Sequence, residues 1–466
     1  MMTLQQALQW VHAAKIVGDA SVEIKRVHTD TRSLQPGDLF VALKGENFDA
    51  HDFLGEAKAM GAVAAIAQHG LVAAGLPGLE VDDPKRALGQ LAKSWRARFD
   101  LPLIAVAGSN GKTTVTQMIA SILRAYKAGQ AFSTEGNLNN DIGVPLTLLR
   151  ISVDHTIGVV ELGMNHPGEI AYLADLASPA VALVNNAQRE HLEFMGTVET
   201  VARENGAVIG ALGAQGVAVF PADEVYTALW RSFAGARASL TFAMTGQADV
   251  TADAHWDTDC WRVLASTPQG AVEYRLHIAG RHNVKNSLAA TACALAAGVP
   301  IDCVSAGLSA FEPVKGRSRA TQVHIAGLSI TLIDDTYNAN PDSMRAAIDV
   351  LAALPGPRLL VMGDMGEVGD QGPQFHEEAG RLAHAQGIDN LYTLGAQSLL
   401  ASSSFGQGRH FDDIDKLKAA VLEQLPYGGS VLVKGSRFMK MERVVQAVTA
   451  CALARTTTLE GNQHAA

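Results

Sequence analysis

Residues 108–114 have the composition of a loop that binds phosphate. The sequence Gly-Ser-Asn-Gly-Lys-Thr-Thr follows an apolar run and precedes a helical pattern. Glycines allow a tight turn that directs backbone N–H groups at phosphate oxygens, and the start of a helix adds the positive end of its dipole. Lys112 supplies a cation for the terminal phosphates, and the Thr113 hydroxyl is placed to ligate Mg²⁺. We therefore predict nucleotide contacts from Gly108, Ser109, Asn110, Gly111, Lys112, Thr113 and Thr114.

The glycine spacing narrows the class of nucleotide-binding protein. The common phosphate loop carries a further glycine five positions before Gly111, where this chain has Val106. A Gly-Lys-Thr tripeptide alone is a weak signal, so the prediction depends on the apolar run before it and the amphipathic pattern after it. The shortened loop argues against the generic motor and signalling nucleotide hydrolases.

A carboxylate stands where a metal-binding part of such a site is expected. Glu161 ends the apolar run Ile157–Glu161, and ligands of open α/β sheets bind at the carboxyl ends of the strands. Mg²⁺ prefers hard oxygen ligands and shares them with substrate phosphates. The alternative is a solvated glutamate at a strand end. We favour the metal role because Glu161 lies at the carboxyl end of a predicted parallel strand, where ligands bind.

Short apolar runs separated by helix-compatible stretches must position these residues, a pattern typical of parallel α/β sheets. With 466 residues, the chain is long enough for two or three domains. We expect a small α/β domain at 1–99, a central P-loop-type ATPase domain with a parallel sheet at 100–316, and a Rossmann-like domain at 317–466. The predicted strands are 38–43, 62–67, Leu103–Ala107, Ile157–Glu161, 180–185, 217–220, 330–334, 358–362, 391–394 and Ser430–Lys434.

Composition excludes several function classes. The net charge of -10 argues against a nucleic-acid surface, because binding to phosphate backbones needs clustered Lys and Arg. The N-terminal segment lacks the pattern of a signal peptide, and no apolar run reaches the roughly 20 residues of a membrane helix. The four cysteines show no metal-binding or disulfide spacing. We expect a cytoplasmic protein without membrane insertion, acting as a monomer.

Several motifs occur in the order seen in the Mur ligases, the enzymes that build the peptide stem of bacterial cell-wall precursors. These are the short phosphate loop, Glu161 at a strand end, Gly-Arg-His-Asn at 280–283, Gly-Arg at 316–317 and Lys-Gly-Ser at 434–436. The resemblance covers residues 29–445. It is strongest to the branch that adds a dipeptide, through the stretches 135–145, 161–166 and 335–341. The Asp-Asn-Pro-Arg motif of the preceding, diamino-acid-adding enzyme is absent.

The resemblance implies an ATP- and Mg²⁺-dependent ligase that joins D-alanyl-D-alanine to UDP-N-acetylmuramoyl-tripeptide. In that reaction the tripeptide carboxylate attacks the γ-phosphate of ATP, and the amine of the dipeptide then attacks the acyl phosphate. Charge on the transferring group would be neutralised by Lys112, Arg317 and Mg²⁺, since positioning and electrostatics carry phosphoryl transfer. The same resemblance assigns Glu161 and His191 to the metals.

This chain departs from the family at one position. Other members usually have a lysine there, and the CO₂-derived carbamate on that lysine bridges metal to phosphate. Asn205 occupies the matching position, in Ala-Arg-Glu-Asn-Gly at 202–206. Asparagine cannot be carbamylated, although its carbonyl oxygen could meet a metal or a metal-bound water. Our hypothesis is that Asn205 replaces the carbamate directly. Glu204 is the weaker substitute, because its side chain should point elsewhere on a helix.

The remaining nucleotide contacts also depend on the resemblance. It places the adenine near Asn283 and Asn286, whose carboxamides can pair with an adenine edge. The alternative for Asn283 is a helix cap. Arg317 could grip phosphate from another domain and so couple closure to ATP binding. Asp334 resembles the acidic residue that the family carries near the nucleotide.

The resemblance also assigns substrate contacts along the chain. Lys434, Ser436 and the helix after them would surround the incoming amine, whose carboxylate needs a cation or a helix N-terminus. The full set of predicted substrate residues is Thr31, Arg32, Lys44, His51, Asn137, Asn139, Asn140, Asn338, Asn340, Lys434 and Ser436, of which the first four would hold the uridine-diphosphate end.

Two other functions remain open from the sequence. A folylpolyglutamate synthase belongs to the same superfamily, but that enzyme lacks a UDP-sugar-binding module. A nucleotide-binding regulatory protein without ligase activity is suggested only by Asn205. ATP hydrolysis that depends on both co-substrates would separate these alternatives from the ligase.

Overall fold

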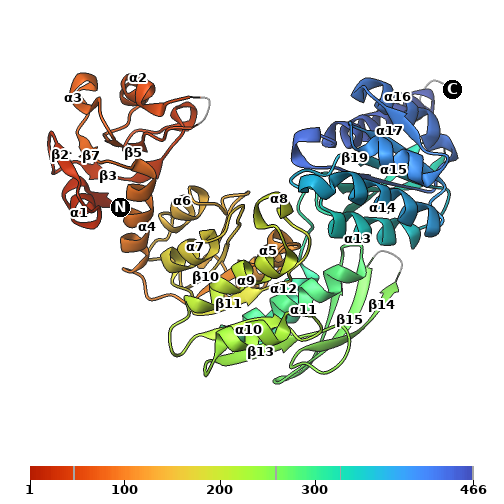
Figure 1. Cartoon of the computed structure of the whole chain (residues 1–466), viewed down its shortest axis with the longest axis horizontal. Helices are drawn as coiled ribbons and strands as arrows, with labels where there is room; N and C mark the ends of the chain where they lie inside the picture. The colour runs from red at the N-terminus through yellow and green to blue at the C-terminus, as the bar shows by residue number, and fades with distance from the viewer. Residues whose placement is uncertain (46–47, 258–259, 326, 464–466) are drawn as a thin grey trace.

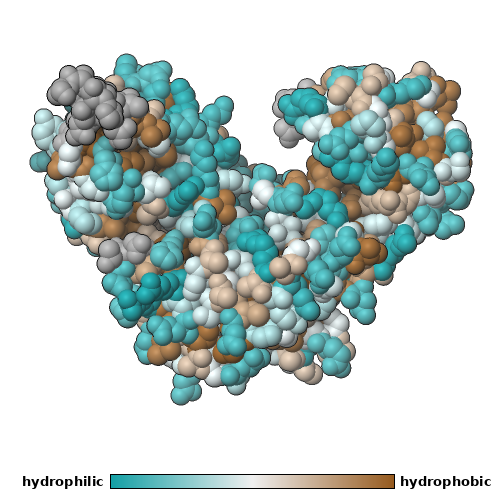
Figure 2. Space-filling model, turned by 180° about the vertical axis from the view of Figure 1, so that it is seen from behind, coloured by the Kyte–Doolittle hydropathy of each residue, from teal (hydrophilic) through white to brown (hydrophobic). Residues whose placement is uncertain are grey.

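The computed structural model describes residues 1–45, 48–257, 260–325 and 327–463, with side chains to residue 453. It forms three α/β units arranged as a V, with the central unit at the base and the N- and C-terminal units as the arms (Figure 1). The space-filling view from behind shows the two arms on either side of an open hollow (Figure 2). Within the described residues, no helix is long and apolar enough to cross a membrane.

The N-terminal unit is built on a five-stranded sheet in the order β2-β7-β6-β5-β4, in which only β2 is antiparallel. The predicted strands at 38–43 and 62–67 are confirmed as β5 and β6, with shorter bounds. The elements are β1 (Met2–Thr3), α1 (Leu4–Trp10), β2 (Lys15–Val17), β3 (Glu23–Ile24), β4 (Arg26–His28), β5 (Asp38–Val41), α2 (Leu54–Ala59), β6 (Ala64–Ala67), α3 (Leu71–Ala74), β7 (Gly78–Glu80) and α4 (Pro84–Arg96).

The central unit contains the predicted parallel sheet, in the order β13-β12-β11-β8-β10-β9. The four predicted strands are confirmed as β8, β10, β11 and β12. The sheet strands are β8 (Leu103–Ala107), β9 (Ala131–Ser133), β10 (Ile157–Glu161), β11 (Val181–Val184), β12 (Val217–Pro221) and β13 (Ala238–Phe242). The helices are α5 (Lys112–Tyr126), α6 (Gly143–Leu148), α7 (Glu169–Ala177), α8 (Leu192–Met195), α9 (Val198–Gly210), α10 (Thr227–Ala234), α11 (Arg281–Ala296) and α12 (Ile301–Ser309).

Alternate residues of β8 belong to different hydrophobic cores. Leu103 and Ala105 pack in the core that includes α4, α6 and α7, whereas Ile104 and Val106 pack with α5 and α11. This period of two follows from strand geometry. Since neighbouring strands repeat the pattern, both faces are covered, as expected for a buried parallel sheet.

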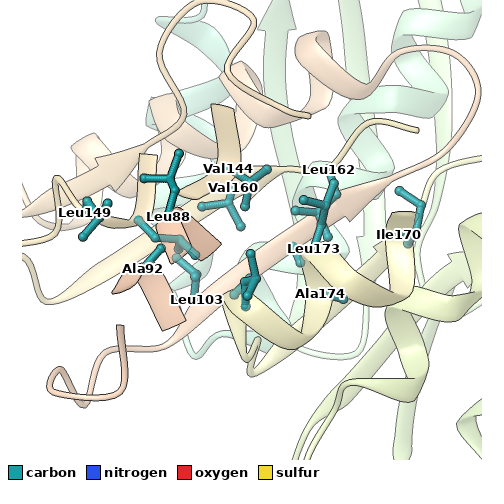
Figure 3. Close-up of a cluster of buried hydrophobic side chains, with 14 of the residues drawn as sticks. Leu88, Ala92, Leu103, Val144, Leu149, Val160, Leu162, Ile170, Leu173 and Ala174 are labelled. Atoms are coloured by element: carbon teal, nitrogen blue, oxygen red, sulfur yellow. The ribbon is translucent and has the colours of Figure 1, made fainter. Parts of the chain in front are cut away.

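Helix α4 packs the N-terminal unit against the central unit. Leu88 and Ala92 of this helix lie against Leu103, Val160 and the residues of α7 (Figure 3). The core on this side is therefore continuous between the two units. Lys93 adds an exposed ion pair with Asp175 of α7 at 2.7 Å, which contributes little because water screens it.

A separate antiparallel sheet follows β13 and was not predicted. It consists of β14 (Thr251–Asp257), β15 (Cys260–Thr267) and β16 (Gly270–Leu276). Its apolar side chains, including Val263 and Tyr274, are buried in the same core as α11. The other face carries charged residues, so these strands lack the continuous apolar runs that reveal the parallel strands.

The C-terminal unit has a six-stranded sheet in the order β17-β18-β22-β19-β20-β21, parallel except for the edge strand β17. The four predicted strands are confirmed as β18, β19, β20 and β22, and the edge strands β17 and β21 were missed. The elements are β17 (Arg319–Ile325), β18 (Leu328–Asp335), α13 (Pro341–Ala352), β19 (Arg358–Gly363), α14 (Gly372–Ala385), β20 (Asn390–Leu394), α15 (Ser398–Phe405), β21 (Arg409–Phe411), α16 (Ile414–Gln424), β22 (Ser430–Lys434) and α17 (Glu442–Gln463).

The main sheets lie within residues 15–80, 103–242 and 319–434. The predicted boundaries near 99 and 316 fall between them. The binding role of each domain stays a prediction.

Candidate active site

A cavity of about 500 Å³ lies between the carboxyl ends of the central strands and the C-terminal unit. The ends of β8, β10 and β11 meet there, where sheet topology places ligands. Most predicted site residues line it, although they come from both units. They are Ser109, Asn110, Gly111, Lys112, Thr113, Thr114, Asn137, Asn139, Asn140, Glu161, His191, Asn283, Asn286, Arg317, Asn338, Asn340 and Lys434.

The phosphate loop connects β8 to α5 and requires glycine at two positions. Gly108 has φ 140 and Gly111 has φ 79, a region that L side chains rarely adopt. A Cβ atom on Gly111 would lie 2.7 Å from Oδ1 of Asn286, so a side chain here would also displace the neighbouring amides. Helix α5 begins at Lys112, and its first three residues line the cavity, so the helix start lies where an anion site needs it.

Lys112 is held in place by three acceptors. Its Nζ donates to the carbonyl oxygens of Gly108 at 2.6 Å and Ser109 at 3.1 Å, and to Oε1 of Glu190 at 2.7 Å. Glu190 was not predicted, because a glutamate in a loop gives no signal of its own. A nucleotide phosphate arriving at Lys112 would compete with this carboxylate.

Glu161 is a buried carboxylate with one free oxygen. It is 1% exposed, and its Oε1 accepts from Oγ1 of Thr113 at 3.0 Å and from Nδ2 of Asn139 at 2.7 Å. Its Oε2 is buried without a partner. A carboxylate oxygen in this state fits a divalent cation, because an unsatisfied buried charge is costly.

The protein ligands of such a cation are few. Among the described residues, no three His, Cys, Asp or Glu side chains are grouped to hold a metal. Mg²⁺ usually keeps several waters and binds one or two carboxylates together with substrate phosphates. Glu161 and Thr113 therefore fit a cation that arrives with the nucleotide.

His191 precedes α8 and lies between two carboxylates. Its Nε2 is 3.6 Å from Oε1 of Glu190, and its Nδ1 is 2.8 Å from Oε2 of Glu367, which belongs to the C-terminal unit. Burial lowers the pKa of His191, but the two carboxylates outweigh this effect and raise the pKa to about 9. In this arrangement the imidazole is protonated at neutral pH, and it would have to lose that proton to hold a metal.

The two asparagines predicted near adenine belong to a chain of amides. Asn185 donates to Oδ1 of Asn286 at 3.0 Å, Asn286 donates to Oδ1 of Asn283 at 2.9 Å, and Asn283 donates to the Ala279 carbonyl at 2.7 Å. The alternative that Asn283 caps the helix is wrong, because the N-cap of α11 is Gly280 and no side chain caps it. The adenine contact stays a prediction.

Asp334 holds the turn that carries Arg317. The carboxylate is buried and accepts from the N–H of Gly316 at 3.1 Å and from Oγ1 of Thr336 at 2.6 Å. Arg317 itself lines the cavity, with its guanidinium carbon 4.1 Å from the ring centre of Tyr337. Asp334 is not among the residues that line the cavity, and it supports Arg317 indirectly, through its hydrogen bond to the N–H of Gly316.

Lys434 lines the cavity on the side of the C-terminal unit, whereas Ser436 lies outside the cavity lining. Lys434 is 2% exposed, and its Nζ donates to Oδ2 of Asp335 at 2.6 Å and to the Asn338 carbonyl at 2.9 Å. Ser436 is buried and donates to the Ala339 carbonyl at 3.0 Å. The charge of Lys434 is thus already compensated. Arg437, which we did not predict, also lines the cavity.

Direct contacts join the central and C-terminal units beside the phosphate loop. Nδ2 of Asn340 donates to Oδ1 of Asn110 at 2.9 Å. Arg189 forms ion pairs with Asp342 at 2.6 Å and with Glu378 at 2.9 Å. The segment that carries Glu190 and His191 is therefore anchored to α13 and α14 on one side and to the phosphate loop on the other.

Asn205 lies behind the phosphate loop and does not line the cavity. It is 1% exposed, and its Oδ1 accepts from the N–H of Gly108 at 3.0 Å. Its Nδ2 is buried without a partner. In this arrangement Asn205 supports the loop, and direct contact with a metal would require its bond to Gly108 to break.

Glu204 caps a neighbouring helix. Its Oε2 accepts from the N–H of Gly168, the N-cap residue of α7, at 2.9 Å, and its Oε1 accepts from the N–H of Ile170 at 2.8 Å. The prediction that Glu204 points away from the nucleotide site is confirmed by these contacts.

We expect Glu204→Ala to lower the free energy of unfolding by about 1–3 kcal/mol, because the buried N–H of Ile170 and the partly buried N–H of Gly168 lose their charged acceptor. Urea-induced unfolding measures the change. Glu199→Ala on the exposed face of the same helix is the matched control, with an expected effect below about 0.5 kcal/mol. Equal effects of the two variants would contradict the capping role.

The four residues predicted for the uridine-diphosphate end lie in the N-terminal unit, outside the cavity lining. Arg32 is exposed and pairs with Asp30 at 2.6 Å, and Lys44 lies 3.7 Å from Asp49. The ring of His51 is buried, with Nδ1 2.5 Å from Oδ1 of Asp49. The structure therefore places Thr31, Arg32, Lys44 and His51 together on one unit without bringing them to the phosphate loop.

Comparison with known proteins adds independent evidence. Residues 23–96 match the family described as Mur ligase family, catalytic domain, residues 106–294 match the Mur ligase middle domain, and residues 318–437 match the Mur ligase glutamate ligase domain. The UDP-N-acetylmuramoyl-tripeptide–D-alanyl-D-alanine ligase of Escherichia coli is 42% identical over 92% of this chain and 94% of its own. The ligase of the same name from Haemophilus influenzae is 40% identical over 95% and 96%.

Solved structures agree with these relatives. A crystal structure of MurF from Acinetobacter baumannii superposes with a TM-score of 0.89 at 35% identity, covering 96% of this chain and 98% of that one. MurF from Thermotoga maritima in complex with ADP superposes with a TM-score of 0.83 at 28% identity, covering 92% and 98%. The resemblance seen in the sequence motifs is confirmed over almost the whole chain. The chain belongs to the Mur ligase family.

Proposed function

We propose that the protein joins D-alanyl-D-alanine to UDP-N-acetylmuramoyl-tripeptide at the expense of ATP, in the bacterial cytoplasm. The observation that carries the proposal is the cavity, in which a phosphate loop from one unit faces Arg317 and Arg437 from the loops of another. The names of the relatives at 40–42% identity support this substrate pair. The N-terminal unit would hold the uridine-diphosphate end, and the chain would act as a monomer.

The residues of the cavity suit acyl-phosphate formation. The carboxylate of the tripeptide attacks the γ-phosphorus, and ADP leaves. Lys112 and the N–H groups at the start of α5 would hold the phosphates, and Arg317 would meet them from the opposite wall. A divalent cation, held by Glu161 and Thr113, would neutralise charge on the phosphate oxygens.

The second step forms the amide bond. The amine nitrogen of the dipeptide attacks the acyl carbon, phosphate leaves, and the nitrogen loses a proton. Lys434 is buried in its ion pair with Asp335, whereas the ion pair of Arg437 with Glu442 is longer, at 3.3 Å, and Arg437 is exposed. Arg437 is therefore the more available cation for the carboxylate of the dipeptide. The contacts between Asn110 and Asn340 would close this side of the cavity and limit the access of water to the intermediate.

We expect phosphate release from ATP and Mg²⁺ to require both UDP-N-acetylmuramoyl-tripeptide and D-alanyl-D-alanine, with one amide formed per ATP. The coupled assay is run with each substrate omitted in turn, and the product is identified by mass. Release that needs neither co-substrate would contradict the ligase. Absence of release beside an active control ligase would favour the regulatory alternative or another pair of substrates.

The folylpolyglutamate synthase alternative gains little from the structure. The synthase of Mycobacterium tuberculosis superposes with a TM-score of 0.61 at 18% identity and covers 80% of this chain, which shows a common fold alone. The same assay with folate and glutamate as substrates would test it directly.

A further inference from the structure

Glu190 is a buried carboxylate whose bonding is incomplete. It is 8% exposed, and its Oε1 is 2.7 Å from Nζ of Lys112. Its Oε2 is buried and has no hydrogen-bond partner. Buried polar atoms almost always have partners, because leaving one unsatisfied is costly. The free oxygen of Glu190 is therefore open to a partner at this point of the cavity, either a water molecule or a cation.

Glu161, at the end of β10, also has an unpaired carboxylate oxygen. Its Oε2 is also buried and unpaired, and both carboxylates line the cavity beside the phosphate loop. Lys112, the first residue of α5, pairs with Glu190, and its neighbour Thr113 bonds to Glu161. Two free carboxylate oxygens thus flank the place where the phosphates of a nucleotide would bind.

Charge balance identifies the class of ligand. Lys112 neutralises Glu190 in this structure, and a triphosphate arriving at the loop would draw that ammonium away. Glu190 and the phosphates would then be neighbouring anions in a confined space. The protonated His191 lies 3.6 Å from Oε1, the oxygen that Lys112 holds, and leaves Oε2 without a partner. A water molecule could satisfy Oε2, but a cation bound there would also lower the repulsion between Glu190 and the phosphates. Carboxylate and phosphate oxygens are the ligands that Mg²⁺ prefers.

We propose that Glu190 is a ligand of a divalent cation that binds together with the nucleotide phosphates. The residue would have two states. Without nucleotide, Glu190 forms its ion pair with Lys112. With nucleotide, Lys112 would bind the phosphates instead, and Glu190 would bind the cation. The proposal rests on the proposed function only in requiring that the cavity binds a nucleoside triphosphate.

Binding of Mn²⁺ to the full-length protein tests the proposal without any ligase substrate. Free Mn²⁺ is counted by electron paramagnetic resonance in the presence of the β,γ-methylene analogue of ATP. Glu190→Gln keeps the size and shape of the side chain but removes its charge. We expect it to raise the apparent Kd for Mn²⁺ at least about tenfold, in line with the loss of a charged oxygen ligand. Glu190→Asp should recover part of the affinity.

A second measurement separates a metal ligand from a simple partner of Lys112. Affinity for the analogue without metal should be unchanged or higher in Glu190→Gln, because Lys112 no longer has a competing carboxylate. Only the gain in affinity caused by Mn²⁺ should be lost. Glu193→Gln, three residues further along and exposed, is the matched control and should leave both affinities unchanged.

Unchanged Mn²⁺ affinity in a folded Glu190→Gln protein would overturn the proposal and leave Glu190 as a restraint on Lys112. Failure of the proposed function would look different. In that case the wild-type protein would bind nucleotide and Mn²⁺ but release no phosphate with the muramoyl and dipeptide substrates.

Discussion

Lys112→Met is expected to lower the kcat of ATP-dependent ligation by at least about a thousandfold, equivalent to roughly 4 kcal/mol of transition-state stabilisation. Methionine keeps the unbranched shape of lysine, one atom shorter, but carries no charge. The phosphates would lose the cation that lies at the start of α5, within 2.6 Å of the loop carbonyl of Gly108. Steady-state phosphate release with both substrates measures the effect.

The control for this variant must account for Glu190, which loses its ion-pair partner. The double variant Lys112→Met with Glu190→Gln removes that unpaired charge. It should unfold at a temperature closer to wild type while remaining inactive. Lys127→Met, just beyond the other end of α5, should retain full activity. A loss of less than tenfold in folded Lys112→Met would contradict the phosphate-binding role.

Glu161→Gln is expected to lower kcat by about a hundredfold or more and to raise the Mg²⁺ concentration needed for half-maximal activity at least about tenfold. The amide oxygen of glutamine can still accept from Thr113 and Asn139, so the fold should persist. What the substitution removes is the charge on the buried, unpaired Oε2. A Mg²⁺ titration of phosphate release measures both effects.

Glu135→Gln is the matched control for Glu161, because Glu135 is exposed and pairs with Arg150. It should leave the Mg²⁺ dependence unchanged. If Glu161→Gln shows the same Mg²⁺ dependence as wild type, the carboxylate does not bind the cation, and its buried oxygen needs another explanation.

The two variants report on different parts of one site. Lys112 acts on the phosphates from the loop, whereas Glu161 acts through the cation from the next strand. Glu190 is connected to both residues in its bonding, since it pairs with Lys112 and carries an unpaired oxygen like that of Glu161. If all three share the nucleotide as a common ligand, their effects on ATP affinity should not be additive.

The sequence by itself determined the local units of this site. Strand β8, the glycine loop and α5 follow from an apolar run, two glycines at positive φ and a helical repeat, all within about two dozen residues. Glu161 was recognised because strand ends in parallel sheets meet at one edge. Motif order over the whole chain was enough to identify the family.

Only the tertiary structure decided which side chains meet. Lys112 pairs with Glu190 from 78 positions away, Asn205 reaches Gly108 across 97, and Arg189 meets Asp342 across 153. Local patterns carry no information about such distances, because side-chain contacts between elements depend on how the sheets and helices pack. For the same reason the sequence did not reveal that Asn205 of α9 accepts a hydrogen bond from the N–H of Gly108 behind the loop, and its contact with a metal stays a prediction.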